Sequence, residues 1–314
     1  MVRAPDLFRR SPANPILTAA DLPYPANAVF NPGAARLEGE TLLLVRVEDM
    51  RGISRLQVAR SADGVSGWMF DAEPLLQSRS ERDSEELWGC EDPRITWLAE
   101  EERWAIAYTA YSRLGPLVAL ATTRDFREVQ RMGPVMSPED KDAALFPRRF
   151  AGRWAMIHRP SPVRGGAHIW ISYSPDLRHW GDHAVLLEAR EGAWWDAGKI
   201  GLGPPPIETS DGWLIVYHGA HATAAGPIYR AGLALLDLDD PSVVLRRSDE
   251  WVFAPREPYE RAGDIPQVVF PCGVVVDEAA DRLDLYYGAA DTVVALASAS
   301  FSDVLEFVRH CPRP

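Results

Sequence analysis

The chain has 314 residues, of which 46% are hydrophobic and 25% charged, and its formal net charge is -12. This composition is typical of a globular protein, and the acidity argues against a nucleic-acid partner or an anionic membrane surface. No run approaches the roughly 18 apolar residues of a membrane span, and the N-terminal residues show no signal-peptide pattern. We therefore expect a protein with no membrane partner and a cytoplasmic location.

The cysteines predict neither a disulfide framework nor a metal site. Cys90, Cys272 and Cys311 are far apart in the sequence, whereas disulfide-rich domains and zinc sites have paired, closely spaced cysteines. A P-loop and a Rossmann glycine fingerprint are also missing from the sequence. The sequence thus predicts no metal and no cofactor.

Signals for helices are scarce, and short β-rich runs recur along the whole chain. Each run follows a turn-like or charged segment, such as 38–40 or 210–212, and such segments commonly separate strands. The clearest predicted strands are 41–47, 104–108, 154–158, 213–217 and 283–287.

A longer pattern also repeats: an apolar strand ends in a small or hydroxyl residue, followed by an acidic turn and often an aromatic residue. Its copies are 56–63, 117–126, 169–176, 232–239 and 293–300. A spacing of roughly 50 to 62 residues and an all-β content predict a five-bladed β-propeller, formed as a single domain over residues 1–314. A β-sandwich of repeated hairpins is the alternative, which the long period and the fivefold count disfavour.

Two adjacent carboxylates stand beside a proline in the segment 89–94. Proline fixes its own φ and biases the preceding residue towards an extended conformation. We therefore expect Asp92 to point in a defined direction at the start of a strand that contains 95–98, and it is a candidate general acid. A solvated acidic turn, or an ion pair with Arg94, fits the same residues equally well, and Glu91 has no assigned role.

A second candidate group is suited to an anion. Its members stand near predicted strand ends among glycines and prolines, where a propeller would direct them to its axis. Arginine offers a planar fork and lysine a point charge, and both bind phosphate well. The group consists of Lys141, Arg159, Lys199, His218, which we expect to end a strand, and Tyr229.

A third group is suited to a sugar, because sugars are bound by directional hydrogen bonds with aromatic faces beneath the rings. Its polar members are Asn31, Arg46, Glu48 and Asp291. Trp88, Trp194 and Trp195 could supply the aromatic faces, and most of the 11 tryptophans are expected to pack between blades.

In this order, the motifs resemble those of glycoside hydrolase family 130, the mannoside phosphorylases. The resemblance covers about Asn31 to Phe307 and depends on the segments 31–34, 89–94, 145–147, 158–160, 199–209, 217–219 and 286–291. It implies a five-bladed β-propeller and the inverting cleavage of β-mannosides by inorganic phosphate, which acts as co-substrate and yields α-mannose 1-phosphate.

The resemblance also implies roles for individual residues. Asp92 matches the catalytic aspartate, whose proton is thought to reach the glycosidic oxygen through the mannose 3-hydroxyl. Lys141, Arg159, Lys199, His218 and Tyr229 match phosphate-binding positions, and Asn31, Arg46 and Asp291 match positions that contact the mannosyl unit.

The charges themselves favour phosphorolysis over hydrolysis. An inverting hydrolase needs a second carboxylate to activate water, whereas phosphate is already an anionic nucleophile and needs cations around it. The alternatives are a β-mannosidase of the same family and a non-catalytic sugar-binding propeller, and a homo-oligomer stays open.

The pair Lys141-Asp142 departs from the Arg-Asn pair of several family branches. Lysine keeps the charge but loses the bidentate geometry of arginine, and Asp142 could either repel phosphate or orient Lys141. The exchange favours the branches that act on β-1,2-linked manno-oligosaccharides.

Overall fold

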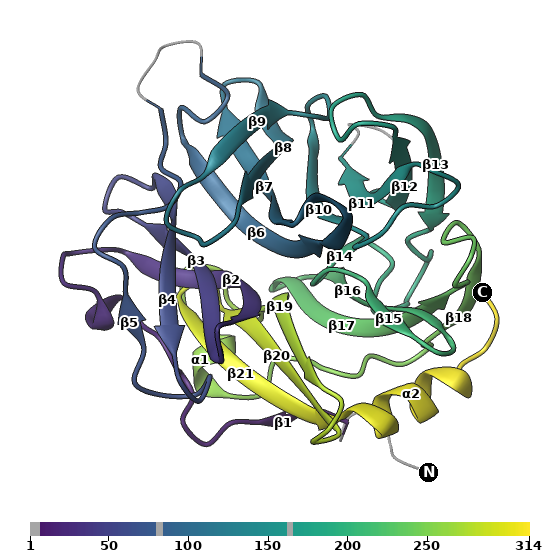
Figure 1. Ribbon diagram of the computed structural model, residues 1–314. Helices are drawn as coiled ribbons and strands as arrows, with labels where there is room; N and C mark the ends of the chain where they lie inside the picture. The colour runs from purple at the N-terminus through teal and green to yellow at the C-terminus, as the bar shows by residue number, and fades with distance from the viewer. Residues whose placement is uncertain (1–6, 80–83, 162–165) are drawn as a thin grey trace.

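The computed structural model describes residues 7–79, 84–161 and 166–314 (Figure 1). These residues form an all-β structure, which confirms the all-β part of the predicted fold class. The helices in this part of the chain are the 3-10 turns η2 (Ala19–Asp21) and η3 (Ala99–Glu101) and the α-helices α1 (Pro258–Arg261) and α2 (Phe301–Arg309). The sequence analysis missed α2, which begins where the Ser300 side chain accepts a hydrogen bond from the Asp303 backbone N–H.

The described strands form five antiparallel meanders that follow one another along the chain. The first two meanders belong to one eight-stranded sheet, where Ser54 of β4 pairs in parallel with Gly89 of β6. The first meander comprises β2 (Ala28–Leu37), β3 (Glu40–Glu48), β4 (Ser54–Ser61) and β5 (Met69–Phe70), and the second β6 (Gly89–Leu98), β7 (Arg103–Ser112), β8 (Gly115–Thr123) and β9 (Gln130–Pro134).

The other three meanders are separate sheets. The third comprises β10 (Asp140–Leu145), β11 (Trp154–Pro160), β12 (Ile169–Ser174) and β13 (Gly181–Leu187). The fourth comprises β14 (Lys199–Leu202), β15 (Ile207–Thr209), β16 (Gly212–Thr223), β17 (Gly226–Leu236) and β18 (Val244–Arg247). The fifth comprises β19 (Val269–Asp277), β20 (Arg282–Ala289), β21 (Val293–Ser300) and, from the N-terminal part of the chain, β1 (Arg9–Arg10), which pairs with β21.

The predicted strands and repeats fall on equivalent places in these meanders. The five predicted strands lie in β3, β7, β11, β16 and β20, the second long strand of each meander. The five repeat copies fall on the third long strand of each meander: they contain all of β12 and β21, most of β4 and β8, and the last five residues of β17. The repeat pattern therefore located the meanders, although it did not give their first strands.

The meanders succeed one another around a common centre, with the first strands β2, β6, β10, β14 and β19 innermost (Figure 1). The apolar residues lie between successive meanders, and the fifth meander packs on the first, so the packing is continuous around the centre. Residues from neighbouring meanders that share one apolar cluster include Leu44 and Ile106, Leu120 and Trp154, Ile157 and Trp213, Val216 and Leu285, and Tyr286 and Val45. Burying each large apolar side chain stabilises the fold by about 1.5–3 kcal/mol.

Arg94 ties three meanders together at the centre. Its side chain is only 1% exposed and donates hydrogen bonds to the Asp92 carbonyl (2.7 Å), the Gly203 carbonyl (3.0 Å) and the Leu202 carbonyl (3.1 Å). Its guanidinium carbon also lies 5.4 Å from the ring centre of Phe270 in β19. Arg94 thus donates to main-chain oxygens and not to the Asp92 carboxylate, which excludes the ion pair considered from the sequence.

We expect Arg94→Met to lower the free energy of unfolding by about 3–5 kcal/mol, because three buried carbonyls lose their donor. Urea denaturation of both proteins measures the change. Arg51→Met is the control, because the Arg51 side chain is 75% exposed and pairs with Asp49 at the surface; it should change the value by less than about 0.5–1 kcal/mol. Equal midpoints for Arg94→Met and the wild type would contradict this role.

Candidate active site

Several first strands shift their pairing register near the centre of the molecule. The residue at the shift is Asn31 in β2, with a φ of 46°, Asp92 in β6, with a φ of 49°, and Asp142 in β10, with a φ of 55°. Asparagine and aspartate tolerate this left-handed conformation better than other residues with side chains. A bulge of this kind redirects a side chain out of the normal alternation, so three polar side chains are redirected at equivalent places.

The expectation for Asp92 was therefore wrong in two respects. Asp92 is not extended, and it lies inside β6 and not at the start of a strand. The preference of a residue before proline is weaker here than the constraint imposed by the bulge between Glu91 and Arg94. A signal was present in the residue types, because asparagine and aspartate, found at positions 31 and 92, tolerate a left-handed conformation better than other residues with side chains.

A largely buried cluster, here called the Asp92 cluster, consists of Asn31 and Asp92, which are buried, and Arg46 and Glu91, whose side chains are 13% exposed. The Asn31 Nδ2 and the Arg46 Nη1 both donate to the Asp92 Oδ1, at 2.8 and 3.1 Å, and the Arg46 Nη2 donates to the Glu91 Oε1 at 3.0 Å. Asp92 is 3% exposed. Close packing maintains the cluster, because a Cβ at Gly288 would lie 1.9 Å from the Asn31 Oδ1.

The acids around this cluster have different pKa values. Burial favours protonation of Asp92, but Arg46 and Lys141 outweigh it and lower its pKa. Burial raises the pKa of Glu91, and the neighbouring Asp92 adds to the increase against the effect of Arg46. Burial and the charge of Asp92 raise the pKa of Asp291 to about 6. In the unliganded protein Asp92 is therefore the most readily ionised of the three.

The five residues predicted for an anion site also come together, around Asp142. The Arg159 Nε donates to the Asp142 Oδ2 at 2.7 Å, and the His218 Nε2 lies 3.5 Å from the same oxygen. The His218 and Tyr229 rings are 6.0 Å apart, and the Lys199 Nζ lies 5.0 Å from the Tyr229 ring centre. His218 lies within β16 and does not end it, contrary to the expectation, because β16 continues to Thr223.

The charges in this group repel one another. Burial lowers the pKa of Lys199, and repulsion from Arg159 and Lys141 lowers it further. Burial lowers the pKa of His218 to about 3, so its ring is neutral near pH 7. Burial also disfavours the charge of Lys141, but the nearby carboxylates of Asp142, Asp92 and Glu91 outweigh this effect and raise its pKa. Lys141, Arg159 and Lys199, here called the cation group, would be stabilised by a bound anion.

Asp142 orients Arg159 in addition to lying beside Lys141. It is fully buried, accepts from the Arg159 Nε, and lies 3.7 Å from the Arg94 Nη2. Burial would raise its pKa, but Arg159, His218 and Lys141 hold it well below its usual range. The sequence left open whether Asp142 repels phosphate or orients Lys141. The structure gives it a hydrogen bond to Arg159 and none to Lys141, so the cation that Asp142 orients is Arg159.

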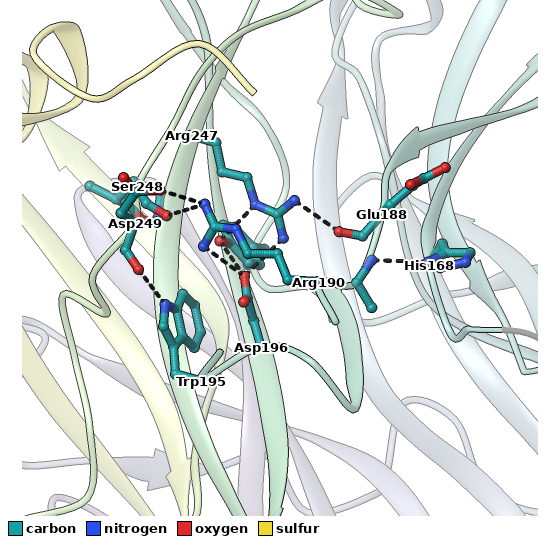
Figure 2. A network of polar contacts seen from close by, with 11 residues as sticks. His168, Glu188, Arg190, Trp195, Asp196, Arg247, Ser248 and Asp249 are labelled. Atoms are coloured by element: carbon teal, nitrogen blue, oxygen red, sulfur yellow. Dashed lines mark hydrogen bonds and ion pairs between the residues drawn. The ribbon is translucent and has the colours of Figure 1, made fainter. Parts of the chain in front are cut away.

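Lys199 follows a segment held by a second buried network (Figure 2). Asp196 accepts from the Arg247 Nη2 at 2.8 Å and from the Tyr217 Oη at 3.0 Å, and Arg190 lies 3.4 Å away. These contacts join the segment before β14 to the other strands of the fourth meander. The network thereby holds the start of β14, and with it Lys199, in position at the centre of the molecule.

The tryptophans predicted as sugar-binding faces differ in their exposure. Trp195 is buried, stacks on Tyr217 with ring centres 5.5 Å apart, and donates from its Nε1 to the Asp249 carbonyl, so its prediction was wrong. Trp194 is 44% exposed, but the Arg190 guanidinium lies 4.3 Å from its ring centre. Trp88, directly before β6, is 41% exposed beside Tyr111.

Residues 7–79, 84–161 and 166–314 contain neither a candidate metal site nor a candidate membrane-spanning helix. Within these ranges no three His, Cys, Asp or Glu side chains are grouped in a way that could hold a metal ion. None of the helices found there has the length and apolar character needed to cross a bilayer.

Comparison with known proteins agrees with the motifs. A family profile described as beta-1,4-mannooligosaccharide phosphorylase matches residues 8–310. A beta-1,4-mannooligosaccharide phosphorylase of Ruminococcus albus is 34% identical, covering 97% of this chain and 91% of that protein. A 1,2-beta-oligomannan phosphorylase of Thermoanaerobacter sp. is 35% identical, covering 95% of this chain and 98% of that protein.

The fold is also similar to that of a solved relative. The structure of a beta-1,2-mannobiose phosphorylase from Listeria innocua, in complex with beta-1,2-mannobiose, superposes with a TM-score of 0.87 at 32% identity, covering 96% of this chain and 99% of that one. The family match over nearly the whole length confirms the resemblance inferred from the motifs: the chain belongs to glycoside hydrolase family 130.

Proposed function

We propose that the protein is an inverting β-mannoside phosphorylase that uses inorganic phosphate as co-substrate and releases α-mannose 1-phosphate. The observation that carries this proposal is the cation group beside the Asp92 cluster, because it offers an anion site next to a candidate acid. The similarity to the Thermoanaerobacter and Listeria phosphorylases favours β-1,2-linked manno-oligosaccharides as substrates.

The five meanders are the blades of a five-bladed β-propeller in this proposal. Two observations support it: the apolar clusters continue from each meander to the next and from the fifth to the first, and β1 completes the fifth sheet. In such a fold the first strands line a central channel, and the candidate residues from all five meanders meet there.

Asn31, Arg46 and Asp291 hold the mannosyl unit, and Asp92 supplies a proton that reaches the glycosidic oxygen through the mannose 3-hydroxyl. A phosphate oxygen attacks the anomeric carbon from the opposite face, and the bond to the leaving sugar breaks in the same step. The anomeric configuration is thereby inverted. The phosphate group of HPO4²⁻ carries one proton, whereas that of the mannose 1-phosphate dianion carries none. This proton can pass to Asp92, which has given its own proton to the leaving sugar, so the acid is restored at the end of the cycle.

Phosphate itself would prepare Asp92 for this role. In the unliganded protein Arg46 and Lys141 keep the pKa of Asp92 low. A dianion bound at the cation group partly neutralises Lys141 and adds a negative charge nearby, and both effects raise the pKa of a carboxyl group. The acid therefore gains its proton when the nucleophile is bound.

A hydrolase and a non-catalytic sugar-binding protein explain the site less well. An inverting hydrolase needs a base on the opposite side of the sugar from the acid, but Glu91 shares Arg46 with Asp92 and Asp142 is used by Arg159. A sugar-binding protein has no need of mutually repelling cations that are buried, as Arg159 is, or half-buried, as Lys141 and Lys199 are, because such charges are costly without an anion.

The test is to incubate the protein with β-1,2-mannobiose, with and without inorganic phosphate, and to follow the products by NMR. We expect α-mannose 1-phosphate and mannose, formed only when phosphate is present. Release of mannose without phosphate would show a hydrolase. Turnover of β-1,4-mannobiose alone would overturn the proposed linkage, and no turnover of any mannoside would favour a binding protein.

Asp92→Asn should lower kcat by about 10²–10⁴-fold, the usual contribution of a general acid, while circular dichroism shows an unchanged fold. Glu91→Gln is the matched control, because the neighbouring carboxylate also contacts Arg46. We expect it to retain far more activity than Asp92→Asn. The reverse order of activities would make Glu91 the acid.

Asp291 should make mannoside binding depend on pH. Its pKa is raised to about 6, so the group is neutral below that pH and ionised above it. If the carboxylate accepts hydrogen bonds from the mannosyl unit, KM for the mannoside should rise about tenfold as the pH falls from about 8 to about 5. Asp291→Asn should have a high KM that varies little over this range; an undiminished pH dependence in the variant would rule this out.

A further inference from the structure

A chain of four polar side chains crosses every strand of the third meander. Starting at the innermost strand, the members are Asp140 of β10, His158 of β11, Ser172 of β12 and His183 of β13. The His158 Nδ1 lies 2.6 Å from the Asp140 Oδ2, the His158 Nε2 lies 2.7 Å from the Ser172 Oγ, and the Ser172 Oγ lies 2.7 Å from the His183 Nδ1. We call these residues the Asp140–His183 chain.

Packing alone does not explain this chain. Asp140, His158 and Ser172 are buried, Ser172 completely, and only His183 is exposed. Burying polar groups costs free energy unless all are hydrogen-bonded, and the Asp140 Oδ1 has no hydrogen-bond partner among the residues that the structure describes. The order Asp-His-Ser is also that of a hydrolytic triad, but a completely buried serine cannot reach a substrate.

The position of the chain connects it with the cation group. Asp140 directly precedes Lys141, and His158 directly precedes Arg159. Lys141 and Arg159 are register partners across β10 and β11, immediately before the register shift that contains Asp142. A contact between Asp140 and His158 therefore joins the two strands at the residues next to both cations.

Two patterns of donors and acceptors fit the Asp140–His183 chain. In both, the His158 Nδ1–H donates to the Asp140 carboxylate. An unprotonated His158 Nε2 accepts from the Ser172 hydroxyl, whose oxygen accepts from the His183 Nδ1–H; a protonated Nε2 reverses these two directions, so that Ser172 donates to the His183 Nδ1. In either pattern all three contacts are hydrogen bonds, and the chain connects the inner strand with the outermost strand of the meander.

We propose that Asp140, His158 and Ser172 are positioning residues that hold Lys141 and Arg159 in the geometry that binds phosphate. The inference rests on the proposed function, in which the cation group receives phosphate. Small displacements of binding groups are costly for function, and the register shift interrupts the pairing of β10 with β11 directly after Lys141. Loss of the chain should weaken phosphate binding and leave mannoside binding unchanged.

The variant Ser172→Ala tests this, with Ser174→Ala as a matched control. Both serines lie on β12 and both are 0% exposed, but the Ser174 Oγ contacts Asp176 in the following turn. Calorimetric titration with inorganic phosphate alone measures Kd, and steady-state kinetics give KM for phosphate and for β-1,2-mannobiose. We expect Ser172→Ala to raise Kd and KM for phosphate about fivefold, as for the loss of one hydrogen bond, without changing KM for the mannoside.

Two further variants keep the test decisive if Ser172→Ala is poorly folded. His183→Ala, at an exposed position, should shift phosphate binding in the same direction by about twofold. Asp140→Asn, which keeps an oxygen acceptor, should weaken phosphate binding less than Asp140→Ala. A purely structural role would lower Tm without this selective change in phosphate binding.

The outcomes separate the two proposals. Phosphate binding by Ser172→Ala that equals the wild type, or that falls equally in Ser174→Ala, overturns the positioning role alone. A wild-type protein that binds no phosphate overturns the proposed function and the positioning role with it.

Discussion

The register shift in the first strands is the constraint on which the rest of the site depends. It places Asn31, Asp92 and Asp142 in a left-handed conformation at the centre, where a regular strand would alternate its side chains between two packed faces. The same irregularity leaves the Asp92 carbonyl available to Arg94, which also binds two carbonyls of the fourth meander. Without the shift, the side chain of Asp92, the proposed acid, would lose its direction, and the centre would lose the hydrogen bonds of Arg94 that connect its strands.

The charges at the centre divide into paired and unpaired groups. Asp92 pairs with Arg46, and Asp142 pairs with Arg159, whereas Lys141 and Lys199 have no hydrogen-bonded carboxylate among the described residues. The lowered pKa of Lys199 reflects burial and this excess of positive charge. An anion of the size and charge of phosphate would relieve the repulsion, which is the physical reason why phosphorolysis explains the site better than hydrolysis.

Different meanders supply the sugar-binding and the phosphate-binding residues of the proposed site. The first meander supplies Asn31 and Arg46, the second the proposed acid Asp92, and the fifth Asp291, the remaining proposed contact of the mannosyl unit. The proposed phosphate ligands come from the third and fourth meanders. Buried polar networks lie behind the phosphate side: the Asp140–His183 chain beside Lys141 and Arg159, and the Asp196 network before Lys199. Each meander can thus set one part of the site while apolar packing between meanders sets their relative positions.

The sequence by itself determined the all-β class, the repeating strand pattern and the family, because period and local motifs depend on residues close together in the chain. It also identified the candidate residues that meet at the centre. Tertiary structure decided the left-handed conformation of Asp92, the burial of Trp195, the pairing of Asp142 with Arg159 and the contacts of Arg94. These depend on strand pairing and on contacts between residues up to 109 positions apart, which no local pattern reports.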